Sequence, residues 1–515
     1  MEAKTLIGFL ALVVGMFMAI LDIQIVASSL AEIQAGVSAS QEEISWVQTS
    51  YLIAEVIVIP ISGWLAHVFS TRLLFSAACF GFTIASVLCS LAWNLESLIV
   101  FRVLQGLLGG MMIPTVFAAS YTLFPRDKQA GITVVIGLVA TVAPAIGPTV
   151  GGYITDSFGW HWLFLINVLP GMIVTLLVFY FVNIDEPDLS RLKGFDLIGI
   201  LLIALFLGCM EFVLEEGPGE DWFNSTEITF FAIIMTVSGI LMFWRELTIE
   251  NPVVNLRAFS DENFAIGSFY SFIVGIGLYG SVYLMPLFLA SVRGYNAVEI
   301  GKVVMVTGVF QFLSAPIAGA LSKKIDLRLM LTIGLFLFGM GLYLNTGLNA
   351  DWSFWEFFVP QMIRGLSLMM IFVPINTLAL GTLPIHELKN ASGLYNLMRN
   401  LGGAVGLAVI NTLLTNQRDL HSSHLSEQIN YGRQQVIDML GQIQTTLTPQ
   451  YGDQAYQATL ELVRTIVGRE AAVMAFADVF MATAAIFFTS MLLMPFVKKV
   501  AIKKDETAEP MPSEA

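Results

Sequence analysis

The chain is poor in charged residues, cysteine and histidine. Only 12% of its 515 residues are Asp, Glu, Lys or Arg, against about 25% in an ordinary soluble domain. It has five histidines and three cysteines, and Cys79, Cys89 and Cys209 all lie in apolar stretches. Their spacing matches neither a disulfide framework nor a metal site. We therefore expect no metal centre, and we interpret the cysteines as packing residues.

Motifs for enzymatic chemistry and nucleotide binding are missing as well. The sequence has no Walker phosphate loop and no nucleophile triad, which argues against an enzyme and against ATP as the source of energy. The net charge is −14, and the basic residues form no stripe that would follow a nucleic acid. We therefore expect no nucleic-acid partner.

What the chain has in abundance is long apolar runs, because 56% of its residues are hydrophobic. About 20 apolar residues cross the hydrocarbon core as a helix, and the first run is too long for the core of a signal peptide. The candidate spans lie near 6–30, 45–66, 73–92, 96–121, 130–154, 160–182, 195–214, 228–247, 264–290, 298–321, 327–346, 355–380, 391–416 and 471–497. The sequence therefore predicts an all-α polytopic protein with fourteen transmembrane helices in contact with membrane lipid.

The distribution of Lys and Arg predicts the orientation of the spans. With the N-terminus in the cytoplasm, nearly all loop Lys and Arg residues fall on the cytoplasmic side, and the short outer loops hold only Arg293. Cytoplasmic loops are the ones that carry an excess of positive charge. Both termini are therefore predicted to be cytoplasmic, which agrees with an even number of spans.

Two pairs of similar stretches indicate an internal repeat. Residues 63–72 resemble 319–328, and residues 105–114 resemble 364–374 in the same order. Repeats of this kind are common in transporters. The predicted parts are a six-helix half at 1–182, an inserted two-helix hairpin with its linkers at 183–262, a second six-helix half at 263–497 and a cytoplasmic tail at 498–515.

A polar, Gln-rich segment at 417–470 is predicted to be a long loop on the outer side. Leu425, Ile429 and Val436 belong to apolar positions that recur at helical spacing, so part of the segment is expected to be helical. Long loops with a pattern of their own are often functional.

Ionisable residues interrupt three of the spans. Asp22, Glu55 and Arg102 lie in the first, second and fourth spans, where an ionisable group costs roughly 2.5–3.5 kcal/mol on the insertion scale. Asp22 and Arg102 suit a pair in which the carboxylate exchanges a proton as its surroundings change. The alternative is a static ion pair that fixes helix packing. Glu55 is a second proton site or a substrate-facing carboxylate, unless it only bonds a neighbouring helix.

Several motifs resemble those of one transporter family. Leu21-Asp-Ile-Gln-Ile-Val26 and Arg102-Val-Leu-Gln-Gly106 are similar to first-span and fourth-span motifs of fourteen-span drug:proton antiporters. The stretch 143–152 resembles their fifth-span antiporter motif and is followed by a familiar stretch at 160–168, while 63–72 occupies the place of a cytoplasmic loop motif. On these motifs the chain resembles the major facilitator superfamily, specifically the EmrB-type inner-membrane efflux pumps.

The resemblance implies a major facilitator fold of two six-helix halves plus two inserted helices. It implies no bound cofactor, because the proton gradient supplies the energy. The residues of the antiporter motif would be Pro144, Gly147, Pro148, Gly151 and Gly152. In the loop motif Gly63 and Arg72 are kept, but His67 replaces the usual Asp, which puts the usual gating ion pair in doubt. Asn396 and Arg399 belong to another familiar stretch and are candidates for lining the path, with packing and capping as the alternative.

The function implied is proton-coupled export of hydrophobic or amphipathic small molecules by alternating access. Relatives of this type work in the bacterial inner membrane with a periplasmic adaptor and an outer-membrane channel, and Leu425, Ile429 and Val436 would dock the adaptor. One alternative is a dedicated exporter of a single metabolite, such as a siderophore or a fatty acid. An alternative of another class is a membrane sensor or scaffold that transports nothing.

Overall fold

The computed structural model describes residues 3–40, 43–192, 196–250, 252–384, 386–430 and 432–497. These residues contain helices and no strand. The α-helices are α1 (Ala3–Ala27), α2 (Leu30–Val37), α3 (Trp46–Phe69), α4 (Thr71–Ser90), α5 (Leu95–Leu123), α6 (Arg126–Phe158), α7 (His161–Leu165), α8 (Val168–Phe181), α9 (Leu197–Glu216), α10 (Thr226–Thr248), α11 (Glu262–Ser291), α12 (Ala297–Leu321), α13 (Leu327–Leu344), α14 (Phe354–Leu380), α15 (Leu388–Gln428), α16 (Gln434–Tyr451) and α17 (Ala455–Ser490).

The prediction of an all-α polytopic membrane protein is confirmed. Within the described residues, 13 helical stretches are long and apolar enough to cross a membrane, and α7 and α8 together make one of them. The two parts of α6 meet at a bend of 46° near Pro144, and counted as one span they raise the number to 14. A proline removes a backbone hydrogen bond and is the usual cause of such a bend.

Capping side chains determine where several spans begin. Asn94 accepts a hydrogen bond from the Ser97 backbone N–H at the start of α5. Asn296 accepts one from the Glu299 N–H at the start of α12 in the same way. These caps satisfy backbone donors that would otherwise be unpaired at a helix end, so the short loops end where the apolar runs begin.

The spans form two groups that meet along a broad contact. Helices α1 and α3–α8 pack among themselves, as do α11–α15 and α17, and the groups touch mainly through α3 with α15 and α6 with α12. Large apolar side chains remain exposed on the outside of the bundle, for example Leu176, Phe312 and Trp244. A lipid-facing surface needs such side chains. The residue boundaries of the two halves stay a prediction.

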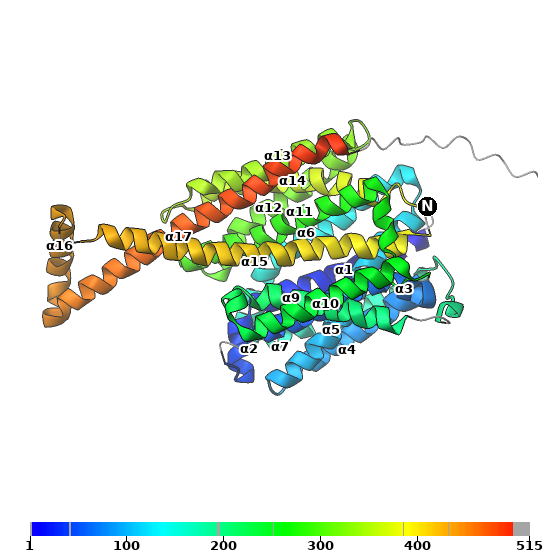
Figure 1. The fold of residues 1–515 in the computed structure, drawn as a ribbon, viewed down its shortest axis with the longest axis horizontal. Helices are drawn as coiled ribbons and strands as arrows, with labels where there is room; N and C mark the ends of the chain where they lie inside the picture. The colour runs from blue at the N-terminus through cyan, green and yellow to red at the C-terminus, as the bar shows by residue number, and fades with distance from the viewer. Residues whose placement is uncertain are drawn as a thin grey trace, which may run out of the picture.

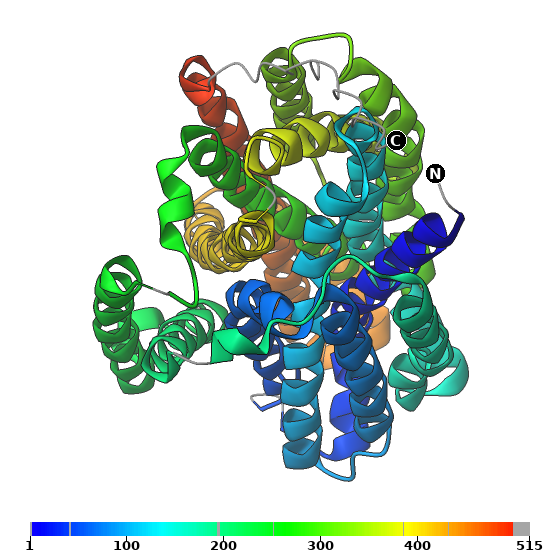
Figure 2. The same ribbon diagram turned by 90° about the vertical axis from the view of Figure 1, so that its right-hand side faces the viewer.

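Helices α9 and α10 pair with each other and stand at the side of the bundle (Figure 2). α10 exposes an apolar stripe that includes Phe230, Ile233 and Ile240, as a lipid-facing helix would. α9 is different, since it also packs against α3 and α15. It therefore reaches the line where the two groups of helices meet.

Helices α15 and α17 continue well beyond the bundle and carry α16 across their tip (Figure 1). The segment 417–470 is therefore almost entirely helical, where the sequence predicted a loop with a helical part. The reason is that residues 407–428 contain no Gly or Pro, so nothing ends α15 at the membrane surface. Gly452, with φ of 53°, lies at the turn between α16 and α17.

Candidate functional site

Asp22 is fully buried in α1 and accepts hydrogen bonds on both carboxylate oxygens. Arg102 Nη1 donates to Oδ2 over 2.7 Å. Asn167 Nδ2 and Gln105 Nε2 donate to Oδ1 over 2.7 and 3.0 Å. Asn167 stands between α7 and α8 and the other two donors belong to α5, so this one carboxylate joins three parts of the first half.

Arg102 is held from several sides. Its Nη1 also donates to Gln105 Oε1 over 2.7 Å, and its Nε donates to the Val47 carbonyl over 3.1 Å. Its guanidinium carbon lies 4.2 Å from the centre of the Tyr51 ring, within the range of a cation–π contact. A Cβ on Gly106 would lie 2.4 Å from the Tyr51 carbonyl oxygen, so only glycine allows α5 this close to α3.

These contacts match a negatively charged Asp22. Each of its three recorded side-chain partners donates a hydrogen bond to it. The orientation of the Gln105 amide follows from its other bonds, because its oxygen accepts from Arg102 and its nitrogen donates to Ser86 Oγ over 2.8 Å. A neutral carboxyl group needs an acceptor for its proton, so protonation of Asp22 requires a rearrangement of this network.

Glu55 occupies a different environment. It is 3% exposed, and Asn400 Nδ2 of α15 lies 3.5 Å from its Oε1, at the limit of a hydrogen bond. It lines a cavity of about 40 Å³ between α1, α3, α9, α11 and α15. One water molecule needs about 10–15 Å³, whereas drug-sized ligands occupy pockets of about 300–1,000 Å³. In this conformation the space beside Glu55 admits water or a small charged group, not a whole drug.

Asn396 and Arg399 are buried in α15 where both groups of helices meet. Arg399 Nη2 donates to Asn396 Oδ1 over 2.8 Å. The Arg399 guanidinium carbon lies 5.6 Å from the ring centre of Phe117 in α5 and 6.0 Å from that of Phe372 in α14. Here the pair is packed between three helices, and its role in a transport path stays a prediction.

The glycines of the antiporter motif bring α6 against α1 just after Asp22. A Cβ on Gly147 would lie 2.3 Å from Gln24 Cβ, and one on Gly151 would lie 2.7 Å from the Ile25 carbonyl oxygen. Contacts this short exclude any larger residue unless the helices move apart. The residues that follow Asp22 are therefore pressed directly onto α6.

The other residues of that motif shape α6 itself. Pro144 is buried and Pro148 half-buried, both inside the helix, and the 46° bend lies beside Pro144. Gly152 is half-buried on the turn that carries Gly151. Glycines that pack this tightly would also suit a seal against proton leak between α6 and α1, and this role is a prediction.

The loop motif lies where α3 touches the start of α15. A Cβ on Gly63 would lie 2.7 Å from the Lys389 carbonyl oxygen. Lys389 Nζ donates to the Ala66 carbonyl over 3.0 Å and forms an ion pair with Asp185, which follows α8. Asp185 in turn accepts from the Thr71 backbone N–H over 3.0 Å. We call Lys389, Asp185 and the backbone of Ala66 and Thr71 the inter-half latch.

Arg72 takes no recorded part in this latch. Its guanidinium carbon lies 5.9 Å from the ring centre of Phe179, and its Nε is buried without a hydrogen-bond partner. The ion pair that joins α15 to the first half therefore uses Asp185, a residue outside the loop motif.

The second half carries a partial copy of the Arg102 site. Arg364 in α14 is 3% exposed and donates from Nη1 to Gln361 Oε1 over 2.8 Å, as Arg102 donates to Gln105. Gln361 Oε1 also accepts from Thr307 over 2.8 Å. Among the described residues no carboxylate forms an ion pair with Arg364. In the repeat Arg364 stands at the position of Gln105, and Gln361 stands at the position of Arg102. The second half thus keeps an arginine–glutamine contact with the two residues exchanged, and it lacks the acid.

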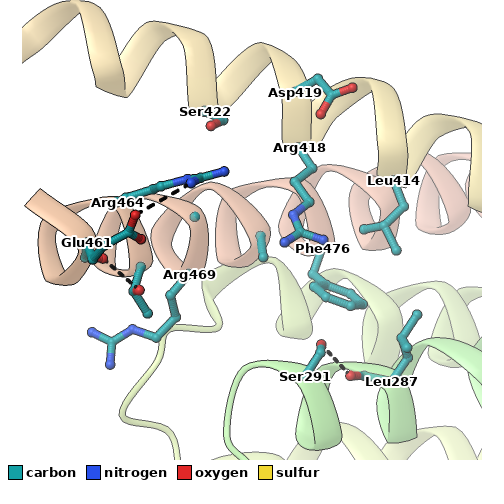
Figure 3. Close-up of a pocket in the computed structure, with 13 residues that line it drawn as sticks. Leu287, Ser291, Leu414, Arg418, Asp419, Ser422, Glu461, Arg464, Arg469 and Phe476 are labelled. Carbon is teal, nitrogen blue, oxygen red and sulfur yellow. Dashed lines mark hydrogen bonds and ion pairs between the residues drawn. The ribbon is translucent and has the colours of Figure 1, made fainter.

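A cavity of about 690 Å³ lies far from these residues, at the base of the projecting arm between α11, α15 and α17. In Figure 3 Arg418 extends from α15 into this space toward Phe476 of α17. The size suits a drug-sized ligand, but the charged groups around it, such as the 84% exposed Arg464 side chain, are solvated. Neither Asp22, Glu55 nor Arg102 lines it, so it is separate from the buried charges.

Leu425, Ile429 and Val436 lie on the arm and are all half-buried. Leu440 of α16 is 8% exposed, and α16 packs against α17. Several apolar side chains of the arm remain exposed: Leu420, Ile437, Met439, Tyr456, Leu460 and Ile466. The structure therefore offers apolar surface on the arm, and docking of an adaptor there stays a prediction.

A membrane bundle of two helix groups with buried opposite charges where the helices meet is the architecture of a secondary transporter. A family model described as Major Facilitator Superfamily matches residues 12–407, and the chain belongs to this superfamily. It is therefore a transporter and not an enzyme.

Individual relatives agree with this assignment. The chain is 41% identical to "Colistin resistance protein EmrB" of Acinetobacter baumannii, with 95% of this chain and 96% of the relative covered. It is 35% identical to "Multidrug export protein EmrB" of Haemophilus influenzae, with 82% of each covered. It is 31% identical to "Fatty acid resistance protein FarB" of Neisseria gonorrhoeae, with 82% of this chain and 83% of the relative covered.

Solved structures agree on the fold. The proton:xylose symporter XylE superimposes with a TM-score of 0.59 at 13% identity, with 96% of each chain covered. The human organic anion transporter MFSD10 gives a TM-score of 0.56 at 11% identity, with 95% of this chain and all of the other covered. The predicted resemblance to EmrB-type transporters of the major facilitator superfamily is confirmed.

Sequence reasoning brought Asp22 and Arg102 together correctly but missed several of their neighbours. Gln105 and Asn167 lie inside motifs that were recognised, so their polar side chains in apolar spans were a usable signal. Asp185 lies in a linker, and nothing in the sequence around it indicates contact with Lys389. Glu211 lies in the apolar run of α9, which was a usable signal, and it lines the same cavity as Glu55.

Proposed function

We propose that this protein exports hydrophobic or amphipathic compounds in exchange for protons, by alternating access between its two groups of helices. The observation that carries the proposal is the buried Asp22–Arg102 pair, with an N–O distance of 2.7 Å and no exposure of either side chain. A buried pair is often no more stabilising than apolar packing. In a transporter core such an ion pair has another use, because the proton affinity of the acid changes when the acid and the base separate.

The two carboxylates have different parts in this exchange. Asp22 is sealed in the present conformation, and the hydrogen bond from Arg102 suits its charged form. Glu55 borders the cavity and contacts α15 of the other half through Asn400. Movement of the halves changes the surroundings of both acids, so binding of protons and movement of the bundle are linked.

The substrate class is supported by the relatives. Their printed names refer to multidrug export, to colistin resistance and to fatty acid resistance. Compounds of these kinds share apolar surface rather than one scaffold. The names do not favour an exporter of one dedicated metabolite, nor a sensor or scaffold that transports nothing.

The setting that we propose is the bacterial inner membrane, with both termini in the cytoplasm. The arm of α15, α16 and α17 projects from the end of the bundle opposite the N-terminus (Figure 1), which on this orientation is the periplasmic side. There we propose that a periplasmic adaptor binds it through Leu425, Ile429 and Val436, and that the adaptor leads to an outer-membrane channel.

Purified protein in proteoliposomes tests the export proposal. With the vesicle interior more acidic than the medium, outward proton flow should drive ethidium or a fluorescent fatty acid into the vesicles. An ionophore that collapses the proton gradient should abolish the accumulation. Accumulation that ignores the gradient, or its absence for every compound tested, would contradict proton-coupled export.

Glu55→Gln provides a finer test, because Gln keeps the size of the side chain and cannot carry a proton. We expect slower gradient-driven accumulation and a weaker dependence of its rate on pH. A variant that transports every compound with the wild-type pH profile would show that Glu55 is only structural.

A further inference from the structure

The inserted hairpin contributes acidic side chains to the cavity beside Glu55. Glu211 and Glu215, one turn apart on α9, line this cavity together with Glu55 of α3. Glu211 is 5% exposed, and its Oε2 is buried without a hydrogen-bond partner. An unsatisfied buried carboxylate oxygen is costly and calls for a ligand.

The hairpin is held in place where it delivers these groups. A Cβ on Gly208 would lie 3.2 Å from Ile57 Cδ1, so α9 lies close to α3 there. Thr49 of α3 donates to Glu216 over 2.9 Å. Trp222, beyond the end of α9, donates to Thr412 of α15 over 2.9 Å. The carboxylates are thus fixed against both groups of helices.

The cavity has more negative than positive groups. Glu211 interacts electrostatically with both Glu215 and Glu55. No cation of the described chain lines the cavity itself, since α1 contributes Ile23, α11 contributes Tyr279 and α15 contributes Asn400 and three small or apolar residues. Arg399, which is held by Asn396, and more weakly Arg102 act on Glu55 from outside the wall. Acids this close cannot all be ionised in a buried site without compensation, so protons or a bound cation must balance them.

The other wall residues define what kind of cation fits. Ile23, Leu52, Val56 and Leu407 are apolar, and the Tyr279 ring stands beside the acids. In the described part of the chain no group of three His, Cys, Asp or Glu side chains is arranged to hold a metal ion. The space of about 40 Å³ admits a compact charged group, while an apolar tail would need the helices to part.

We propose that Glu211 and Glu215 of the inserted hairpin, together with Glu55, bind the ammonium group of amphipathic organic cations. Binding of the cation displaces protons from these carboxylates, so the same groups carry protons in one direction and cationic substrate in the other. The inference rests on the proposed export function and extends it, because it assigns to the hairpin a part in the choice of substrate.

A pair of matched probes tests the site directly. Phenylbutylammonium and phenylbutanol share their tail and differ in charge, and both can be titrated into protein in lipid nanodiscs by calorimetry. We expect the wild type to prefer the ammonium probe and to release protons on binding it, which two buffers of different ionisation enthalpy reveal. The Glu211→Gln/Glu215→Gln double variant should raise the ratio of the ammonium Kd to the alcohol Kd about tenfold or more and reduce the proton release.

Glu220→Gln is the matched control, since Glu220 is exposed at the tip of the same hairpin. It removes one negative charge, as Glu215→Gln alone does, and should leave the ratio as in the wild type. Should the double variant not fold, Glu215→Gln alone should still raise the ratio. An unchanged ratio in folded variants, or an equal change in Glu220→Gln, would overturn the inference. Gradient-driven accumulation by the wild type would then still support export, whereas its failure would count against the proposed function itself.

Discussion

At the scale of single residues, the same contacts of Asp22 contribute to folding stability and to the proposed proton exchange. Its three donors come from Arg102, Gln105 and Asn167, so the carboxylate is satisfied only while it is charged. Removal of one partner from a buried ion pair typically costs about 3–5 kcal/mol, because the other charge is left uncompensated. Removal of both is often far cheaper, which allows packing and proton exchange to be separated.

Asp22→Asn should therefore destabilise the protein by about 3–5 kcal/mol and abolish gradient-driven export. The asparagine cannot cycle a proton, and Arg102 remains buried without its counter-ion. Thermal unfolding of the purified variant and accumulation in acid-inside proteoliposomes measure the two effects.

The double variant Asp22→Asn/Arg102→Gln is the control for stability. Its unfolding temperature should return most of the way to that of the wild type, since neither buried charge remains. It should still fail to export. Export at the wild-type rate by this variant would show that the pair has only a packing role.

At the scale of elements, the close contact between α6 and α1 depends on glycines, which have no side chain. Gly147 and Gly151 let the bent helix α6 lie directly on the turn of α1 that follows Asp22. Inserted methyl groups in a well-packed core commonly cost about 1–3 kcal/mol. A shift of α1 would also displace Asp22 from its donors.

Gly151→Ala should lower stability by about 1–3 kcal/mol and slow gradient-driven export, because its Cβ would lie 2.7 Å from the Ile25 carbonyl oxygen. Gly131→Ala is the matched control on the same helix, since a Cβ there meets nothing within 4 Å. Thermal unfolding and the rate of gradient-driven accumulation in proteoliposomes compare the two. Equal behaviour of both variants would remove the proposed role of the close contact.

At the scale of the whole molecule, the inter-half latch holds the halves together at the end that carries the N-terminus. Lys389 joins α15 to Ala66 and Asp185, and Lys389 and Asp185 are 13% and 21% exposed. Contacts of this kind contribute about 1–2 kcal/mol, which changes a two-state ratio roughly 5–30-fold.

Lys389→Met should therefore widen the distribution of distances between spin labels placed on the two halves at that end. The exposed Lys324→Met is the control for loss of a positive charge. The exchange variant Asp185→Lys/Lys389→Asp should restore part of the narrow distribution. Identical distributions for Lys389→Met and the wild type would exclude a latch.

The arm of α15, α16 and α17 projects beyond the membrane bundle, where a partner protein can reach it. Replacement of the arm segment 417–470 by a short Gly/Ser linker should abolish adaptor pull-down and efflux from cells, while accumulation in proteoliposomes survives. Replacement of α16 alone, with α15 and α17 kept, tells whether the tip or the helical stalk makes the contact. Unchanged adaptor binding by a well-expressed protein without the segment would refute docking on the arm.

The sequence by itself determined the spans, the class of protein and the central acid–base pair. Apolar runs of span length specify membrane helices because the bilayer leaves their backbone no other way to satisfy its hydrogen bonds. Asp22 and Arg102 stood out because charge in such a run is costly and therefore rare. Local patterns were enough to find the spans and to single out each charged residue. The pairing of Asp22 with Arg102, 80 positions apart, followed from their opposite charges within such spans.

Only the tertiary structure decided which distant groups meet. The ion pair of Lys389 with Asp185 joins residues 204 positions apart, and the cavity unites Glu55 with Glu211 and Glu215 of the inserted hairpin. The length of the arm also became visible only in three dimensions, because the predicted loop continues the helices of two spans. These features depend on how helices pack, and packing is set by close contacts such as those of Gly63 and Gly208, which hydropathy and local motifs do not encode.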